Sequence, residues 1–193
     1  TVIALDLNDG LPRAHARKSQ IAGKHGCSVH YVQGNLFRPP VRPNSVDLIY
    51  SSGVIHPTPD SKATFEKLIP LLKVGGRMYV WVYGRRAIPV RVFFACGRRL
   101  KSFVSLKSVL RVCKIIAPPF KIASDMASRL GLIEFRTRSV REITLDLFDA
   151  FSPQFNHTHS REEVQAWFKE VGLINIAVSG IQKHGFGVHG DRA

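Results

Sequence analysis

Short apolar runs alternate with helical patterns along the first part of the chain. The runs that we expect to form strands span residues 2–5, 29–32, 46–50 and 77–83. Near-continuous apolar runs of this length are typical of buried parallel strands. Between them, apolar residues recur at helical spacing over 11–22 and 60–72. This alternation predicts an α/β fold with a parallel sheet covered by helices on both faces.

Capping and breaking residues predict where the helix over 60–72 begins and ends. Asp60 suits its N-cap position. Pro70 lies inside the pattern and is expected to kink or shorten the helix, because proline lacks the N–H group that the helix needs. The two glycines at 75–76 are expected to end it.

The pattern changes between residues 84 and 147. One amphipathic helix is predicted over 106–116, closed by Pro118-Pro119, and another over 123–130, closed by Gly131. No strand pattern is evident there. About 60 residues are too many for a plain loop, so we interpret 84–147 as an inserted helical cap.

The first pattern returns over residues 148–193. Ser160 and Glu163 form a predicted capping box, and the apolar helix face that follows ends at Gly172. An apolar strand is predicted over 173–178. Alternating small and apolar residues over 185–190 predict a last strand at the edge of the sheet.

Charge is concentrated in the inserted segment. The chain has a net charge of +14, and residues 85–146 hold 14 Lys/Arg against four Asp/Glu, which leaves +10 there. Such a surface suits phosphate, anionic lipid or an acidic substrate, and it also suits plain solvent on an ordinary cap.

Two partners other than solvent are compatible with this basic segment. Peripheral contact with an anionic membrane through 85–146 is one, since Phe93, Phe94, Phe103 and Leu106 are interleaved with the basic residues. Nucleic acid is the other and ranks lower, because no recognisable RNA-binding module accompanies the charge.

Neither a metal site nor a membrane span is expected. Cys27, Cys96 and Cys113 have no CxxC spacing, so neither zinc nor a disulfide framework is indicated. No run approaches the roughly 20 apolar residues that cross a bilayer. We expect a cytoplasmic protein that can contact the membrane surface peripherally.

Polar residues follow three of the predicted strands. Asp6 ends the first, Asn35 follows the second, and Ser51-Ser52-Gly53 ends the third. Ligands of open α/β sheets bind beyond the carboxyl ends of the strands. His56 lies three residues beyond Gly53 and is expected over the same strand end.

Three blocks of sequence resemble the class I S-adenosylmethionine-dependent methyltransferases, in particular the ubiquinone/menaquinone C-methyltransferases. The blocks are 2–8, 31–36 and 46–60, the last running on to Val-Gly-Gly-Arg-Met-Tyr-Val at 74–80. The resemblance implies a Rossmann-like, doubly wound, mostly parallel sheet with S-adenosylmethionine as cofactor. Residues 1–83 would form the cofactor-binding half, 84–147 the cap, and 148–193 the C-terminal part of the core.

The resemblance also implies which residues hold the cofactor. They are Asp6, Leu7, Asn35, Leu36, Ser51, Ser52 and Gly53. Asp6 would accept both ribose hydroxyls, Leu7 and Asn35-Leu36 would contact the adenine, and Ser51 to Gly53 would pass beneath the methionine part. Asn35 stands where the family usually has Asp, and its side-chain carbonyl can also accept from the exocyclic amine.

One departure from the family concerns the glycine-rich loop after its first strand. No such loop occurs here, and the chain opens at what would be the second strand. We therefore expect that an N-terminal piece is missing and that a gap separates the strands at 2–5 and 46–50. We also expect this fragment to be inactive alone.

The implied reaction is in-line methyl transfer to a small, apolar acceptor of lipid or quinone type. His56 is the candidate general base. The alternative is that His56 only shapes the wall of the pocket. Tyr83, His157 and His159 are candidate acceptor-binding residues, with packing or solvated loops as alternatives. The alternative to an enzyme is a non-catalytic methyltransferase-like module or a basic membrane- or RNA-binding protein. An RNA methyltransferase is less favoured.

Overall fold

The computed structural model describes residues 1–7, 28–85, 92, 95–97, 99, 103–131, 138–182 and 184–193. The chain divides into two compact units: unit 1 is Thr1–Arg85 with His157–Ala193, and unit 2 is Arg86–Asn156. The helix expected over 11–22, Phe93 and Phe94 lie outside the described residues. Unit 2 extends beyond the expected insertion because a helix continues across residue 147.

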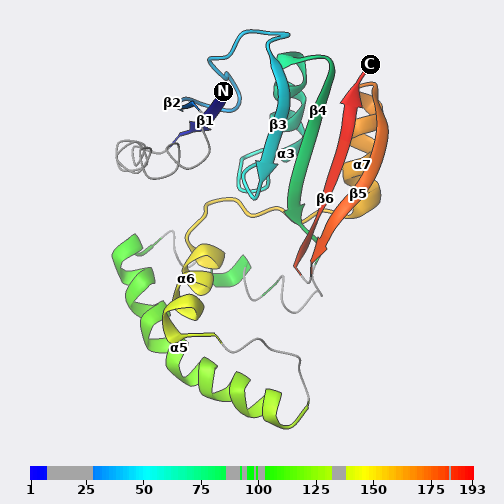
Figure 1. Cartoon of the computed structure of the whole chain (residues 1–193). Coiled ribbons are helices and arrows are strands. Elements are labelled where there is room, and N and C mark those ends of the chain that lie inside the picture. The colour runs from blue at the N-terminus through cyan, green and yellow to red at the C-terminus, as the bar shows by residue number, and fades with distance from the viewer. Residues whose placement is uncertain are drawn as a thin grey trace. The chain divides into compact units, whose positions relative to one another are not determined.

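The described strands of unit 1 form two sheets (Figure 1). They are β1 (Val2–Asp6), β2 (Val29–Gln33), β3 (Val46–Ser52), β4 (Leu72–Tyr83), β5 (Leu173–Gln182) and β6 (Gly185–Arg192). β1 and β2 form a parallel pair, and the second sheet has the order β3-β4-β6-β5. β3 and β4 are parallel, whereas β6 runs antiparallel to β4 and β5. The expected α/β fold class is confirmed.

β1 and β3 each pair with one strand among the described residues. No β-bridge between described strands joins the two sheets. The segment that connects β2 to β3 links them differently, because Leu36 and Val41 pack against the core of the four-stranded sheet. Among the described strands, β1 and β3 are thus not paired with each other, and the missing strand between them stays a prediction.

Helices α3 (Ser61–Leu68) and α7 (Arg161–Glu170) share a hydrophobic core with one face of the four-stranded sheet. Met78, Val80 and Val82 alternate along β4 and are fully buried on this face. The ring centroids of Phe65 on α3 and Phe168 on α7 are 4.8 Å apart. Each such buried side chain contributes about 1.5–3 kcal/mol, so this core carries most of the stability of unit 1.

Helix α3 is shortened by proline, as expected. It ends at Leu68, a 3₁₀ turn follows over Ile69–Leu71, and β4 begins at Leu72. Pro70 lies in that turn and has no N–H to donate to a preceding carbonyl. The expected stop at the glycines 75–76 is wrong, because these residues lie inside β4.

The opposite face of β4 carries an aromatic row, Tyr79, Trp81 and Tyr83. Tyr79 stacks on Tyr50 of β3, with ring centroids 4.9 Å apart and planes 5° from parallel. Trp81 meets Tyr83 edge-on at 5.4 Å. The cross-strand stack of Tyr50 on Tyr79 stabilises the pairing of β3 with β4, and the edge-on contact fixes neighbouring side chains within β4.

β6 approaches this aromatic row through glycines. A Cβ atom on Gly187 would lie 2.5 Å from the Tyr79 hydroxyl oxygen. One on Gly185 would lie 2.4 Å from both the Trp81 ring and the Val82 carbonyl oxygen. The expectation that 185–190 forms an edge strand is wrong: β6 lies between β4 and β5, where its small residues leave room for the aromatic rings.

Unit 2 includes two long helices, α5 (Leu106–Arg129) and α6 (Val140–Phe151). α5 continues through Pro118-Pro119, where two separate helices were expected. Each proline removes one helical hydrogen bond. The helix persists because its buried residues Val109, Cys113 and Ala117 form one continuous stripe and because it packs along α6.

We expect Gly185→Ala to destabilise the protein by about 1–3 kcal/mol, because the new methyl group would overlap the Val82 carbonyl oxygen. Gly84→Ala is the matched control, since its Cβ atom would meet only ordinary contacts, the nearest at 3.8 Å from Phe186. Urea denaturation of both variants measures the difference. Equal stabilities would contradict the described approach of β6 to β4.

Candidate active site

The carboxyl ends of β1 and β2 hold Asp6 and Asn35 at the same end of a parallel pair. Asp6 is opposite Gln33, and its backbone carbonyl accepts a hydrogen bond from the Gly34 N–H at 2.9 Å. The Asp6 residue is exposed, and Leu7 is 68% exposed. A carboxylate in this position can accept hydrogen bonds from a diol, and Leu7 offers an apolar surface beside it.

Asn35 and Leu36 play different parts in the turn after β2. The Asn35 Oδ1 atom accepts the Phe37 N–H at 2.9 Å, and the Asn35 backbone carbonyl accepts the Arg38 N–H at 2.9 Å. One lone pair of Oδ1 and the side-chain amide hydrogens remain for a ligand. Leu36 is partly buried and packs against the core, and its contact with adenine stays a prediction.

The end of β3 combines a buried hydroxyl with an unusual backbone conformation. Ser51 is 6% exposed, and its Oγ atom has no hydrogen-bond partner among the described residues. Ser52, the next residue, is exposed. Gly53 has φ = 75°, a conformation that favours glycine, and its N–H donates to the Trp81 carbonyl at 3.0 Å.

His56 turns back over this strand end. A Cβ atom placed on Gly53 would lie 3.8 Å from His56 Cε1. The His56 ring is 4% exposed and packs on Tyr83 of β4, with centroids 4.3 Å apart. The His56 carbonyl also accepts the His157 N–H at 3.0 Å. The structure therefore brings His56, Tyr83 and His157 together beside Gly53.

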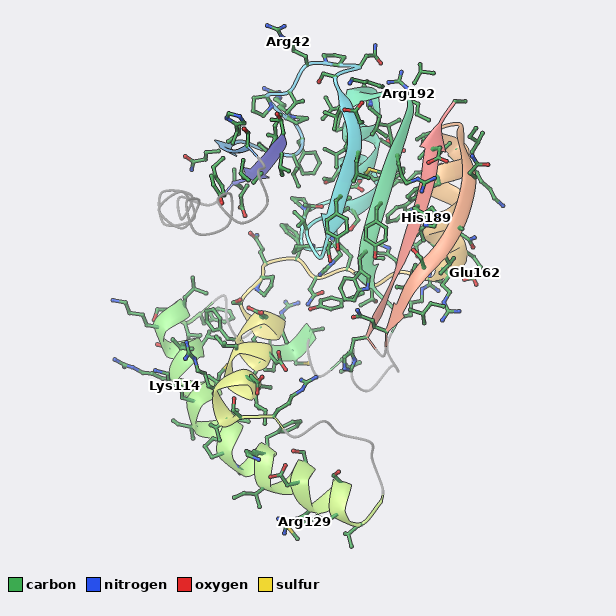
Figure 2. The ribbon with its side chains drawn as sticks, in the orientation of Figure 1. Arg42, Lys114, Arg129, Glu162, His189 and Arg192 are labelled. Atoms are coloured by element: carbon green, nitrogen blue, oxygen red, sulfur yellow. The ribbon has the colours of Figure 1, made fainter. Side chains whose placement is uncertain are left out.

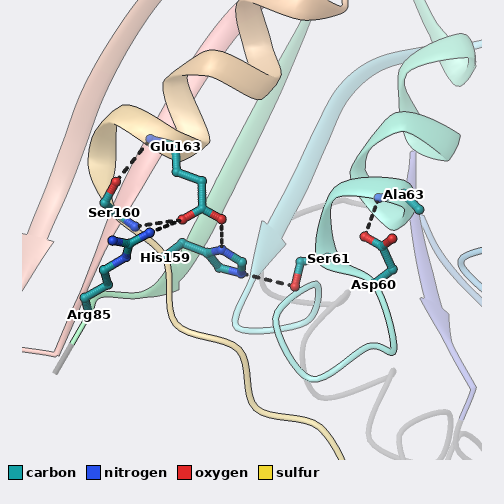
Figure 3. Close-up of polar contacts among 7 residues, drawn as sticks. All are labelled: Asp60, Ser61, Ala63, Arg85, His159, Ser160 and Glu163. Carbon is teal, nitrogen blue, oxygen red and sulfur yellow. Dashed lines mark hydrogen bonds and ion pairs between the residues drawn. The ribbon is translucent and has the colours of Figure 1, made fainter. Parts of the chain in front are cut away.

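His159 is held differently from the other three. Its Nδ1 atom is 2.7 Å from Glu163 Oε1, and its Nε2 atom is 3.1 Å from Ser61 Oγ (Figure 3). The ring is 7% exposed and meets Trp167 edge-on. Because both ring nitrogens contact protein groups, His159 joins α3 to α7.

The order Ser61–His159–Glu163 has the geometry of a hydrolase triad, but its burial argues against that chemistry. Ser61 is 4% exposed, so an acyl group would have no access to its hydroxyl. The three residues therefore serve as a structural link.

The carboxylate of Glu163 is the anionic group among the contacts of His159, and its surroundings lower its pKa. Burial acts to raise the pKa of its carboxyl, but hydrogen bonds from His159, Ser160 and Arg85 and the charge of His159 outweigh it and lower the pKa. Arg85 Nη2 lies 3.2 Å from Glu163 Oε2. The same carboxylate accepts the Ser160 N–H in the predicted capping box.

A comparison with protein families gives one match. Residues 1–80 match the family described as "Methyltransferase domain". These residues include the ends of β1, β2 and β3 with Asp6, Asn35 and Gly53. Over these residues, which are less than half of the chain, the match supports the expected resemblance to S-adenosylmethionine-dependent methyltransferases. A comparison with curated protein sequences gives no match.

Solved structures of methyltransferases share this fold. A SAM-dependent methyltransferase from Aquifex aeolicus is 14% identical with a TM-score of 0.52, covering 100% of this chain and 69% of its own. A possible histamine N-methyltransferase from Thermotoga maritima is 13% identical with a TM-score of 0.51, covering 100% and 73%. Magnesium protoporphyrin IX methyltransferase from Synechocystis PCC 6803, with bound SAH, is 9% identical with a TM-score of 0.53, covering 100% and 64%.

Sequence identities this low show that the fold is shared. They do not show which molecule accepts the methyl group. This chain spans only 43% of the length of two other similar structures, an O-methyltransferase family protein from Burkholderia thailandensis being one. The function of the whole protein therefore goes beyond what these likenesses establish.

S-adenosylmethionine is the cofactor of this methyltransferase family, and the residues at the strand ends fit it. The buried Ser51 hydroxyl lacks a described partner and can bond a polar group of a ligand that passes over β3. Gly53 presents no side chain there, and the exposed Asp6 suits a ribose diol. Among the described residues, no group of three or more His, Cys, Asp or Glu could hold a metal ion.

The sequence patterns did not predict the contacts of His159 with Ser61 and Glu163. Its partner Ser61 is 98 residues away and carries no signal of its own. His159 precedes the N-cap Ser160 of α7, so the helical i, i+4 rule does not apply to its contact with Glu163. Glu163 was predicted only as a capping residue.

We expect Glu163→Gln to destabilise the protein by about 1–3 kcal/mol at neutral pH, because it weakens hydrogen bonds to a charged acceptor. Since the pKa of Glu163 is lowered from its ordinary value of 4.5, the wild-type advantage is fully present above that pH. It disappears as the pH falls through the lower folded value. Thermal denaturation between neutral and acidic pH measures it.

The control for this variant is Glu170→Gln, on the same helix. Glu170 forms an ion pair with Lys62 and its side chain is 53% exposed, so we expect a change below about 1 kcal/mol. A Glu163→Gln defect that stayed constant from neutral to acidic pH would show that the carboxylate charge does not hold the link.

Proposed function

We propose that the intact protein transfers a methyl group from S-adenosylmethionine to a small, apolar acceptor of lipid or quinone type. The match of residues 1–80 to the methyltransferase domain carries this proposal. It is supported by the polar groups of Asp6, Asn35 and Ser51 at the strand ends. The neighbouring rings of His56 and Tyr83 favour an apolar acceptor.

The cofactor supplies a methyl group on a sulfonium, already activated toward in-line displacement by a nucleophile. The residues of this chain bind and orient it. Asp6 accepts the ribose hydroxyls, Leu7 covers the adenine, and Asn35 contacts the adenine edge. Ser51, Ser52 and Gly53 support the methionine part. Correct alignment in a dry pocket can supply most of the rate of such a reaction.

On the acceptor side, His56 and Tyr83 form the wall and His157 adjoins them. We assign to His56 the removal of the acceptor proton where the acceptor must lose one. Its position beside Gly53 supports this role. His159 is left out of the acceptor site, because both of its ring nitrogens contact Glu163 and Ser61.

We further propose that the protein works in the cytoplasm and contacts anionic membrane through residues 85–146. The net charge of +10 in this segment supports that contact. A lipid-like acceptor would be reached from such a surface. None of the helices in the described part of the chain is long and apolar enough to cross a bilayer.

A non-catalytic methyltransferase-like module is the second candidate. The observation in its favour is that no described β-bridge joins β1 and β2 to the four-stranded sheet. The two groups of cofactor residues, around Asp6 and around Gly53, thus belong to separate sheets. A module of this kind would have no measurable affinity for S-adenosylmethionine.

Calorimetry on the intact protein tests the cofactor site. We expect S-adenosylmethionine to bind and Asp6→Ala to weaken binding at least tenfold, because the variant removes the acceptor for the ribose diol. Asp47→Ala is the matched control: Asp47 lies near the start of β3 and pairs with Lys73 at 2.7 Å. Undiminished binding in Asp6→Ala would remove the assignment, and no binding to the wild type would favour the non-catalytic module.

The role of His56 is tested by turnover. His56→Phe retains a ring against Tyr83 but removes the nitrogen atoms, so we expect the Kd of S-adenosylmethionine to change less than about twofold. We expect kcat to fall by about 10²-fold or more, as on loss of a general base. Turnover within a few-fold of wild type would reduce His56 to a wall residue.

A further inference from the structure

Helix α5 has an exposed apolar stripe in addition to its buried one. The stripe consists of Val112, Ile115, Pro119, Ile122 and Met126. These residues recur at i, i+3, i+7, i+10 and i+14, which is the spacing of one helix face. The exposed fractions of Val112, Ile115, Ile122 and Met126 are 52%, 73%, 62% and 58%.

Pro118-Pro119 does not interrupt this stripe, because α5 is continuous from Leu106 to Arg129. The other face is the one that is buried, through Val109, Cys113 and Ala117. α5 therefore presents apolar side chains on two faces, and the described residues of unit 2 cover only one of them. Exposed aliphatic residues gathered on one face mark an interaction surface.

Basic residues share helix α5 with the stripe. α5 contains five Lys/Arg (Lys107, Arg111, Lys114, Lys121 and Arg129) against one acid, Asp125, a balance of +4. Asp125 pairs with Lys121 at 2.6 Å. No described carboxylate lies within ion-pair distance of Lys107, Arg111, Lys114 or Arg129.

The positions of these cations matter as much as their number. Arg111 precedes Ile115 by four residues and Arg129 follows Met126 by three, so each lies next to the stripe. Figure 2 shows Lys114 and Arg129 extending away from the α5 ribbon. Long basic side chains can keep their charge in water or against phosphate while their stems lie along an apolar surface.

The chemistry of the stripe selects among possible partners. A second copy of this chain would bring the like charges of two α5 helices together, which opposes pairing. A nucleic acid would meet aliphatic side chains that offer neither stacking nor hydrogen bonds. An anionic lipid surface suits both the apolar stripe and the basic residues of α5. Acyl chains can surround the aliphatic side chains, and headgroup phosphates attract the cations.

We propose that the outer face of α5 is the membrane-docking element of this protein, with Val112, Ile115, Ile122 and Met126 entering the lipid and Arg111, Lys114 and Arg129 meeting anionic headgroups. This inference rests on the membrane contact proposed above and names its surface. Docking would place α5 in the plane of the interface, since the stripe runs along the length of the helix.

Vesicle co-sedimentation of the intact protein tests the proposal. The vesicles are phosphatidylcholine alone and phosphatidylcholine mixed with phosphatidylserine, at about 0.1 M and about 1 M salt, where charges are screened beyond about 10 Å and about 3 Å. We expect binding to the mixed vesicles to exceed binding to phosphatidylcholine at least tenfold and to fall at high salt. Equal binding to both vesicles, or none, would overturn the proposal.

Two double variants separate the apolar and basic contributions. Ile115→Ser with Ile122→Ser removes stripe residues, and Arg111→Gln with Lys114→Gln removes cations. We expect each to weaken binding at least tenfold. The matched control is Leu145→Ser, since Leu145 is 49% exposed on α6, and we expect it to bind as wild type does. Circular dichroism checks that all variants keep their helices.

The remaining outcomes are also decisive. Single-stranded RNA binding that is lost in the basic variant and kept in the serine variant, without vesicle binding, would favour nucleic acid. A dimer that the serine variant dissociates would favour a second copy. Calorimetry with S-adenosylmethionine is run on the same variants: binding that persists while vesicle binding fails separates this inference from the methyltransferase assignment.

Discussion

A single buried imidazole joins the elements that surround the ends of β3 and β4. The ring of His159 contacts Ser61 at the start of α3 and Glu163 in the first turn of α7. Its backbone bonds Tyr83 and Arg85 on both sides of the β4 end. Two helix starts and a strand end are therefore joined through one residue. The loop that holds Gly53 and His56 leads directly into α3, so it adjoins this junction.

Apolar patterning predicted the strands well, because burial in a parallel sheet leaves a strong local signal. Contacts between residues far apart in the sequence left no such signal. The continuity of α5 through Pro118-Pro119 depends on packing that outweighs two lost hydrogen bonds, and breaker rules consider only the local chain. The interior position of β6 depends on Gly185 fitting against the Trp81 ring, which a count of alternating residues cannot reveal.

The candidate site was predicted in part. Strand-end reasoning located the turn at Gly53 and the position of His56 beside it, because both follow from where an apolar run stops. It did not foresee that Leu36 packs into the core or that both nitrogens of His159 have protein partners. Turns and loops lack a period, so which of their side chains face inward is decided by the elements they meet.

The strand order has a consequence for how the chain folds. β6 follows β5 in the sequence, yet it lies between β4 and β5. The ion pair between Arg77 and Asp191 joins residues 114 positions apart. The four-stranded sheet cannot be completed on the ribosome until β6 has emerged, and contacts so distant in sequence slow folding. Until then the exposed edge of β4 is open to wrong partners, which makes this interval the period of greatest aggregation risk during synthesis.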